Sequence, residues 1–122
     1  MTPLMKAYAD CWLRDYNEGL IARDLNYRDN LWLTLSEWEV AMAEATPNGY
    51  NDFEAHEIAN KLKALLNDKI ECITIQGARE GSVACYIKAE QSLLKKLAEQ
   101  IRKIHLADEI DIVNNELRLW WD

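Results

Sequence analysis

Two segments of helical periodicity, separated by strand-like segments, constrain the fold of this chain more than any other feature. Residues 51–68 and 89–105 repeat apolar side chains every three or four positions, as amphipathic helices do. The first segment opens with Asn51 and Glu54 in the spacing of a capping box. Each segment is therefore expected to form one helix. The positions opposite the second apolar stripe are basic: Lys95, Lys96, Arg102 and Lys103.

The residues between these two helices alternate like a pair of β-strands. Residues 69–76 and 82–88 flank the loop Gly77-Ala-Arg-Glu-Gly81, whose two glycines are typical of a hairpin connection. In the register that this loop suggests, Gln76 pairs with Ser82. The segment is therefore expected to form an antiparallel hairpin.

Residues 109–113 and 116–122 form a second pair of alternating segments around Asn114-Asn115. Because Asn tolerates positive φ, this dipeptide suits a two-residue turn. The order of elements from residue 51 onward is helix, strand, strand, helix, strand. With a strand from residues 6–16 in front, it becomes the ferredoxin-like βαββαβ arrangement with additions. We predict a single α+β domain over residues 1–122, with about three helices and an antiparallel or mixed sheet.

The first half of the chain contains one clear helix and one open alternative. A helix from Ser36 to Ala45 is expected, because Pro47 would end it and capping-box patterns begin it. Residues 4–27 fit either a helix or two strands around a turn, and the β-forming residues after Gly19 favour the hairpin. The two overlapping capping boxes are Thr34-x-x-Glu37 and Ser36-x-x-Glu39.

No residue pattern of a known catalytic, metal-binding or nucleotide-binding site is present. His56-Glu57 lacks the second histidine of an HExxH zinc site, because Asn60 stands in its place. The three cysteines lack CxxC spacing, and strand alternation would place Cys72 and Cys85 on opposite faces of the sheet as free, buried thiols. We predict that the protein is not an enzyme and has no catalytic residues, no metal and no cofactor.

The net charge is concentrated in the first half of the chain. Residues 1–60 hold 4 Lys and Arg against 11 Asp and Glu, whereas residues 61–122 hold 10 of each. This balance disfavours direct binding to DNA or RNA, which requires a basic surface to neutralise phosphates. Acidic side chains interleaved with aromatic ones are typical of a protein–protein interface that binds a basic partner. The residues we expect to contact such a partner are Asp24, Asp29, Trp32, Glu37, Glu39, Glu44, Glu54 and Glu57.

The sequence also bears on location and self-association. No apolar run approaches the roughly 20 residues that cross a bilayer, and the N-terminal segment is too polar for a signal peptide. A cytoplasmic protein without membrane contact is expected. The basic face of residues 89–105 could bind the acidic half of a second copy, which would give a homo-oligomer.

Asp15-Tyr16-Asn17-Glu18-Gly19, followed by an acidic helix that ends at Thr46-Pro47, resembles the opening hairpin of ArdA-type antirestriction proteins. That resemblance implies an acidic mimic of DNA that occupies the DNA-binding groove of a restriction enzyme. The present chain departs from the family in its neutral second half.

Three classes of function follow from these observations. The main hypothesis is a non-enzymatic interaction protein, of the inhibitor, antidote or immunity type, that binds a basic surface through its acidic N-terminal half. Nucleic-acid-handling proteins carry such basic surfaces. The first alternative is an acidic DNA mimic with an antirestriction or anti-defence role. The second is an uncharacterised enzyme or small-molecule binder, which requires a concave pocket with converging polar groups.

Overall fold

The computed structural model describes Lys6, residues 32–80 and residues 82–122. The alternative between a helix and a hairpin for residues 4–27, and the strand expected at residues 6–16, lie outside these residues apart from Lys6. The elements are, in chain order, α3 (Leu35–Ala45), α4 (Ala55–Leu66), the 3-10 helix η1 (Asn67–Cys72), β1 (Thr74–Arg79), β2 (Val83–Lys88), α5 (Gln91–Lys103), β3 (Glu109–Val113) and β4 (Glu116–Trp121).

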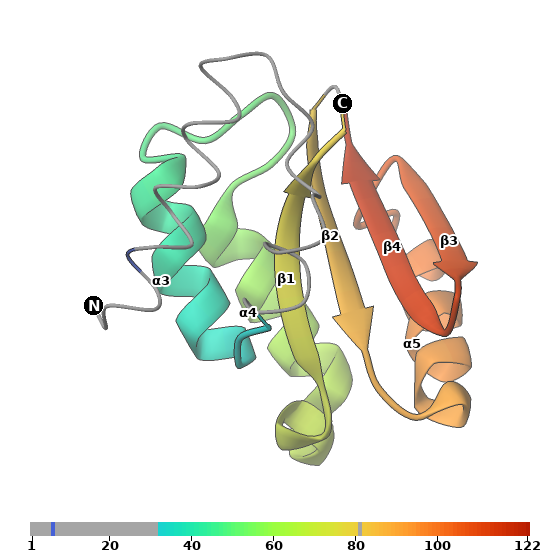
Figure 1. Cartoon of the computed structure of the whole chain (residues 1–122). Helices are drawn as coiled ribbons and strands as arrows, with labels where there is room; N and C mark the ends of the chain where they lie inside the picture. The colour runs from blue at the N-terminus through green and yellow to red at the C-terminus, as the bar shows by residue number, and fades with distance from the viewer. Residues whose placement is uncertain (1–5, 7–31, 81) are drawn as a thin grey trace.

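The four described strands form one antiparallel sheet in the order β1-β2-β4-β3 (Figure 1). Helices α3, α4 and α5 pack against it, which confirms the predicted α+β class. Since β4 pairs antiparallel with both β2 and β3, these last two strands run in the same direction with β4 between them. The ferredoxin-like order is not confirmed within the described residues.

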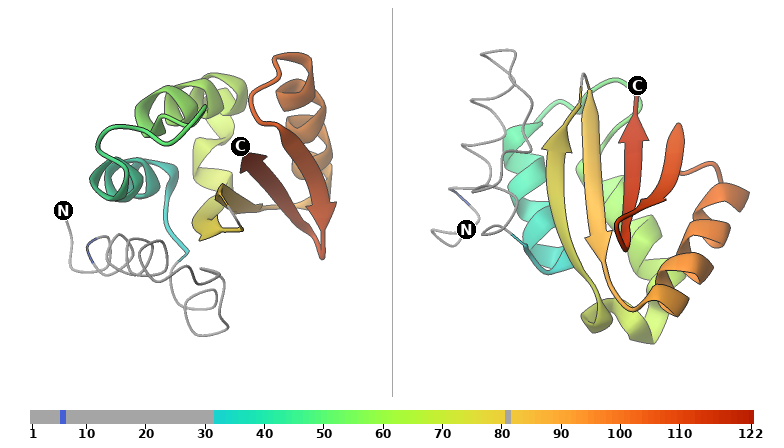
Figure 2. Two further views of the ribbon diagram at one scale, coloured as in Figure 1. Left: turned by 90° about the horizontal axis from the view of Figure 1, so that it is seen from above. Right: turned by 45° about the vertical axis from the view of Figure 1, so that its right-hand side comes forward.

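All three helices lie on one face of the sheet and enclose the main core (Figure 2). Trp38 of α3, Phe53 of the loop before α4 and Trp121 of β4 form an aromatic cluster there. The ring centroids of Phe53 lie 6.0 Å from Trp38 and 5.0 Å from Trp121, both in edge-to-face geometry. Each of these three side chains is at most 1% exposed, so the cluster ties the helix layer to the middle of the sheet.

Side-chain caps set the start of two helices. Thr34 accepts a hydrogen bond from the backbone of Glu37, whose carboxylate accepts one in return, as the first capping box predicted. The capping box expected from Asn51 and Glu54 is wrong. Asn51 lies in a turn with φ of 52°, and Glu54 itself caps α4 by accepting a hydrogen bond from Glu57 N. Helix α4 therefore begins about one turn later than Asn51 and Glu54 suggested.

The register of the first hairpin differs from the prediction. Gln76 pairs with Tyr86 rather than with Ser82, because β1 continues through Gly77 to Arg79 and the turn comes later. Residues 67–72 form η1, so residues 69–72 do not belong to the expected strand, and Cys72 is exposed while Cys85 is buried on β2. The expected free thiols are both present, but the expected burial of Cys72 is wrong.

The second hairpin agrees with the prediction. Asn114 and Asn115 have φ of 52° and 63°, the left-handed conformation that a two-residue type I′ turn requires at both positions. The turn joins Val113 directly to Glu116, which are the first pair of the register between β3 and β4. Asn at both turn positions thus fixes the alternation of every side chain on the two strands.

Candidate functional site

The acidic side chains of α3 have different structural roles. Glu37 closes the capping box at the start of the helix. Glu39 faces α4, where its carboxylate contacts Lys63 Nζ at 2.6 Å and His56 Nδ1 at 2.8 Å. Glu44 is exposed in the last turn of the helix. Of these three expected contact residues, Glu44 is the one left accessible without an observed structural role.

The ion pairs of Glu39 shift the ionisation of the groups involved. Burial alone would raise the pKa of Glu39, but hydrogen bonds and charges from Lys63 and His56 more than offset this, so its pKa is lowered. The hydrogen bond to Glu39 raises the pKa of His56, which is 60% exposed. With only 15% of its side chain exposed, Glu39 joins α3 to α4 and offers little surface to a partner.

Glu54 and Glu57 lie at the start of α4, and both are exposed. Glu54 caps the helix, and Glu57 forms an i,i+4 ion pair with Lys61 at 3.0 Å. Solvent-exposed ion pairs of this kind contribute at most about 1 kcal/mol. Both carboxylates therefore remain available for longer-range attraction of a basic surface.

Trp32 does not lie with the expected acidic contact residues. It packs beside Ala84 and Tyr86 on the sheet face opposite the helices, and Lys88 Nζ lies 5.4 Å from its ring centroid. Asp24 and Asp29 fall outside the described residues. The structure thus separates Trp32, as a candidate apolar anchor, from the carboxylates of α3 and α4.

The end of α3 and the end of β4 lie at the same end of the described domain (Figure 1), and segments from distant parts of the sequence are joined there. The backbone of Asp122 donates to the Asp108 carboxylate at 2.8 Å, and its carbonyl accepts from Asp52 N at 3.4 Å. These bonds join the loop before α4, the loop after α5 and the end of β4. We call the group of exposed carboxylates at this end the acidic end: Glu44, Asp52, Glu54, Glu57, Asp108 and Asp122.

A hollow of about 220 Å³ lies within the acidic end. Three carboxylates line it, those of Asp52, Glu57 and Asp108, together with the cationic side chain of Lys61 and with His105. Its floor includes the aromatic core residue Trp121, which is 1% exposed. The lining has one Lys against three acids, so a cationic side chain from a partner would be stabilised there.

The opposite face of the sheet carries a second group of charges, centred on Arg118 of β4. Its guanidinium contacts the carboxylates of Glu80, Glu109 and Asp111 at 3.0–3.2 Å. Burial would lower the pKa of Arg118, but the hydrogen bond to Glu109 and the charge of Glu80 raise it above its usual range. This cation is satisfied within the domain and is not free to bind an anionic ligand.

Glu44, Glu54 and Glu57 are expected from the sequence, but the carboxylates that the fold brings near them are not. Asp52 was visible as part of the acidic half. Asp108 and Asp122 belong to the half whose net charge is zero, so no count along the chain selects them. Their position depends on the course of β3 and β4, which the spacing of charges does not reveal.

Among the described residues, no group of three or more His, Cys, Asp or Glu side chains has a geometry that could hold a metal ion. No helix in that part of the chain is long and apolar enough to span a membrane. Comparisons with protein-family models, with curated proteins and with solved structures gave no significant match to this chain.

Proposed function

We propose that this protein is a non-enzymatic interaction module of the inhibitor, antidote or immunity type, which binds a basic protein surface through its acidic end. The observation that carries the proposal is the convergence of Asp52, Glu57 and Asp108 around one hollow. The size of this hollow, about 220 Å³, suits a lysine or arginine side chain better than a drug-sized substrate.

The surrounding charge supports the same function. From Trp32 to Asn60 the chain contains six carboxylates and no Lys or Arg. Negative potential concentrated at one end of a domain accelerates encounter with a positive surface and orients the complex. Binding of this kind becomes slower and weaker as salt concentration rises, because exposed charges are screened over about 8–10 Å at physiological ionic strength.

The proposal is tested by affinity purification of partners from the native host, with quantification by mass spectrometry. The test variant is Glu44→Lys, Asp52→Lys, Asp108→Lys. The matched control, Asp68→Lys, Glu71→Lys, Glu99→Lys, makes the same change in net charge at exposed positions away from the acidic end. We expect a partner with a basic surface to bind the wild type and the control and to be lost with the test variant.

Equal recovery of that partner with both triple variants would contradict docking through the acidic end. The DNA-mimic alternative uses the same surface and makes one further prediction. If the partner binds DNA through the site that this protein occupies, double-stranded DNA will compete with the protein for it. Simultaneous binding of DNA and protein by the partner would identify a different docking site and would argue against mimicry.

A further inference from the structure

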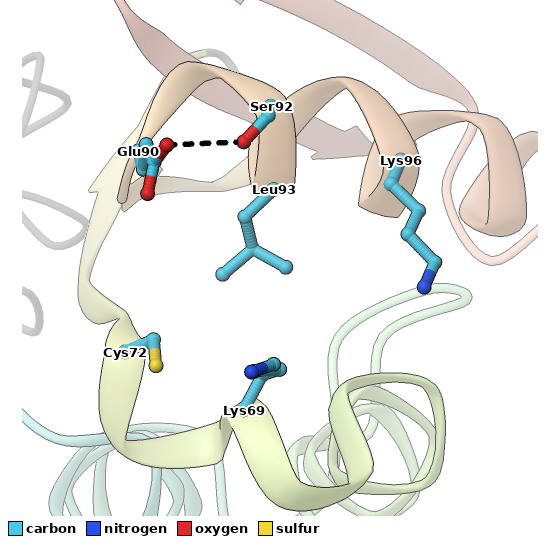
Figure 3. A pocket seen from close by; sticks show the side chains of 6 residues that line it. All are labelled: Lys69, Cys72, Glu90, Ser92, Leu93 and Lys96. Carbon is cyan, nitrogen blue, oxygen red and sulfur yellow. Dashed lines mark hydrogen bonds between the residues drawn. The ribbon is translucent and has the colours of Figure 1, made fainter.

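A pocket of about 460 Å³ lies between η1 and the first turns of α5, outside the acidic end (Figure 3). In Figure 3 Lys69 and Cys72 of η1 border one side of this space, and Leu93 points into it from α5 on the other side. This volume falls within the range of pockets that hold small organic molecules. The lining residues are Lys69, Cys72, Glu90, Ser92, Leu93 and Lys96.

The pocket continues into an adjoining hollow of mixed lining, in which leucines lie beside polar side chains. A second hollow of about 350 Å³ shares Lys69, Leu93 and Lys96 with the first and continues between α4 and α5, past Leu65 of α4 and Leu97 of α5, with Asp68 also in its lining. Leu65 and Leu93 are half-buried, so apolar surface is accessible at the junction. A ligand that occupies both hollows would therefore place an apolar portion against the leucines, next to two ammonium groups.

Within the described part of the chain, the two lysines of the pocket have no carboxylate partner, unlike four other cations of the domain. Among the described residues, neither Lys69 nor Lys96 forms an ion pair, although the net charge of the protein is −7. The carboxylate in the lining, Glu90, accepts a hydrogen bond from the Ser92 hydroxyl at 3.3 Å. Four other cations are paired with carboxylates, namely Lys61, Lys63, Lys103 and Arg118, whereas the exposed Lys95 outside the pocket is also without an ion pair among the described residues.

The start of α5 is a second feature of this pocket that favours a negative group. Glu90 is the N-cap residue, and its side chain makes no capping hydrogen bond to the helix backbone. The first amides of α5, at Gln91, Ser92 and Leu93, therefore lack a side-chain acceptor at the helix end that lines the pocket. A helix end of this kind favours a negative group nearby.

We propose that this groove binds a small organic monoanion, a carboxylate with a short apolar chain. The carboxylate lies against Lys69 and Lys96, and the apolar chain follows Leu93 toward Leu65 and Leu97. Lysine provides the charge, and the leucines provide an apolar surface that a simple inorganic anion would not use. This binding site is independent of the acidic end and of the partner proposed to bind there.

Octanoate serves as the probe, with binding followed by two-dimensional ¹H–¹⁵N NMR on the full chain. Octanamide, which has the same chain without the charge, and inorganic phosphate, which has charge without a chain, are the matched ligand controls. We expect saturable shifts at residues of η1 and the start of α5 with octanoate and at least about fivefold weaker binding of either control. Equal binding of octanamide, or equal binding of phosphate, would overturn the proposed ligand class.

Two double variants test the residues. Lys69→Gln, Lys96→Gln removes the ammonium groups that line the pocket. Lys95→Gln, Lys103→Gln removes the same charge from exposed positions of α5 outside it. We expect octanoate to bind the first variant about tenfold more weakly than the second. Equal affinity of the two variants would overturn the assignment of the anion to Lys69 and Lys96.

Cys72 provides a second measurement within the same pocket. Its alkylation by anionic iodoacetate and by neutral iodoacetamide can be compared by peptide mass spectrometry, and the ratio of the two rates reports local potential. Cys85 gives little background, because burial and the charge of Glu80 raise the pKa of its thiol. We expect the rate with iodoacetate, relative to that with iodoacetamide, to fall in Lys69→Gln, Lys96→Gln. The same ratio should stay unchanged in the control variant Lys95→Gln, Lys103→Gln. An unchanged ratio in both would contradict a positive pocket.

Discussion

The two faces of the sheet are built from the same strands but are stabilised in different ways. On the helix side, alternate residues of β4, from Leu117 to Trp121, are buried in an apolar core. On the opposite side, Arg118 binds three carboxylates, and Trp120 donates its indole hydrogen to Glu80 O at 2.8 Å. The indole of Trp121 donates to Leu106 O at the same distance, so adjacent tryptophans satisfy their polar atoms on opposite faces.

This contrast shows how one alternating strand combines two kinds of stabilisation. The helix side is stabilised by the removal of apolar surface from water, an effect that does not require particular orientations of the side chains. The opposite side depends on specific pairs, which contribute little when complete and cost much when one partner is lost. Substitutions on the two faces should therefore differ in how much they lower the free energy of unfolding. They should also differ in whether a second substitution can restore it.

The largest effect is expected from Phe53→Ala on the helix side. The ring is 1% exposed and lies between Trp38 and Trp121, so its removal leaves a cavity that the surrounding rings cannot fill. We expect the free energy of unfolding to fall by about 3–5 kcal/mol, measured by urea denaturation with tryptophan fluorescence. A loss below about 1 kcal/mol would show that the cluster repacks and that the helix layer is not held rigidly.

An intermediate effect is expected from Arg118→Met on the opposite face. The alkyl part of the side chain is kept, but Glu80, Glu109 and Asp111 lose their shared cation. We expect destabilisation by about 1–3 kcal/mol, because Glu80 is only 25% exposed and keeps a charge without its partner.

A second substitution distinguishes lost pairing from lost packing at Arg118. In the background of Arg118→Met, Glu80→Gln removes the carboxylate with the smallest exposed fraction of the three. If charge pairing stabilises this face, the double variant will be more stable than Arg118→Met alone. A double variant that is less stable would show that packing dominates on both faces.

The smallest effect is expected from His56→Gln on α4, which removes the ion pair between His56 and Glu39 of α3. Its pKa is raised by Glu39 above the ordinary 6.5, so the charged pair is fully present below about pH 6.5 and is lost as pH rises through the raised value. His56→Gln should therefore cost about 0.3–0.5 kcal/mol near pH 5.5 and less near pH 8.5.

Urea denaturation of wild type and His56→Gln at both pH values measures this difference. Lys63 remains paired with Glu39 in the variant, and the lowered pKa of Glu39 keeps that carboxylate ionised over this range. An equal loss of unfolding free energy at the two pH values would mean that the imidazole acts through packing alone. The ion pair between His56 and Glu39 would then contribute nothing to stability on the helix side.

The two hairpins show why part of the fold was predictable. Asn114 and Asn115 favour left-handed backbone, so a local signal set the turn and with it the register of β3 and β4. In the first hairpin, Gly77 lies inside β1 opposite Cys85, although it read as the beginning of a loop. Ile75 of β1 is buried in the core, and residues 69–72, expected to begin the strand, belong to η1.

The candidate site was less predictable than the fold. A sequence reveals that Glu44 and Glu57 are acidic, but not that Glu39 is occupied by Lys63 and His56. Contacts between residues 17 to 24 positions apart depend on how α3 packs on α4. The meeting of Asp52 with Asp108 depends likewise on the whole sheet, and no periodicity along the chain encodes it directly.

The place of β4 in the sheet has a consequence for synthesis on the ribosome. This strand follows β2 and β3 in the chain but lies between them, and its Trp121 completes the aromatic cluster. Until residues 116–121 have left the exit tunnel, β2 and β3 have no strand between them, and Phe53 lacks one neighbour. The nascent domain therefore stays open, with apolar surface accessible to chaperones, until this internal strand is released.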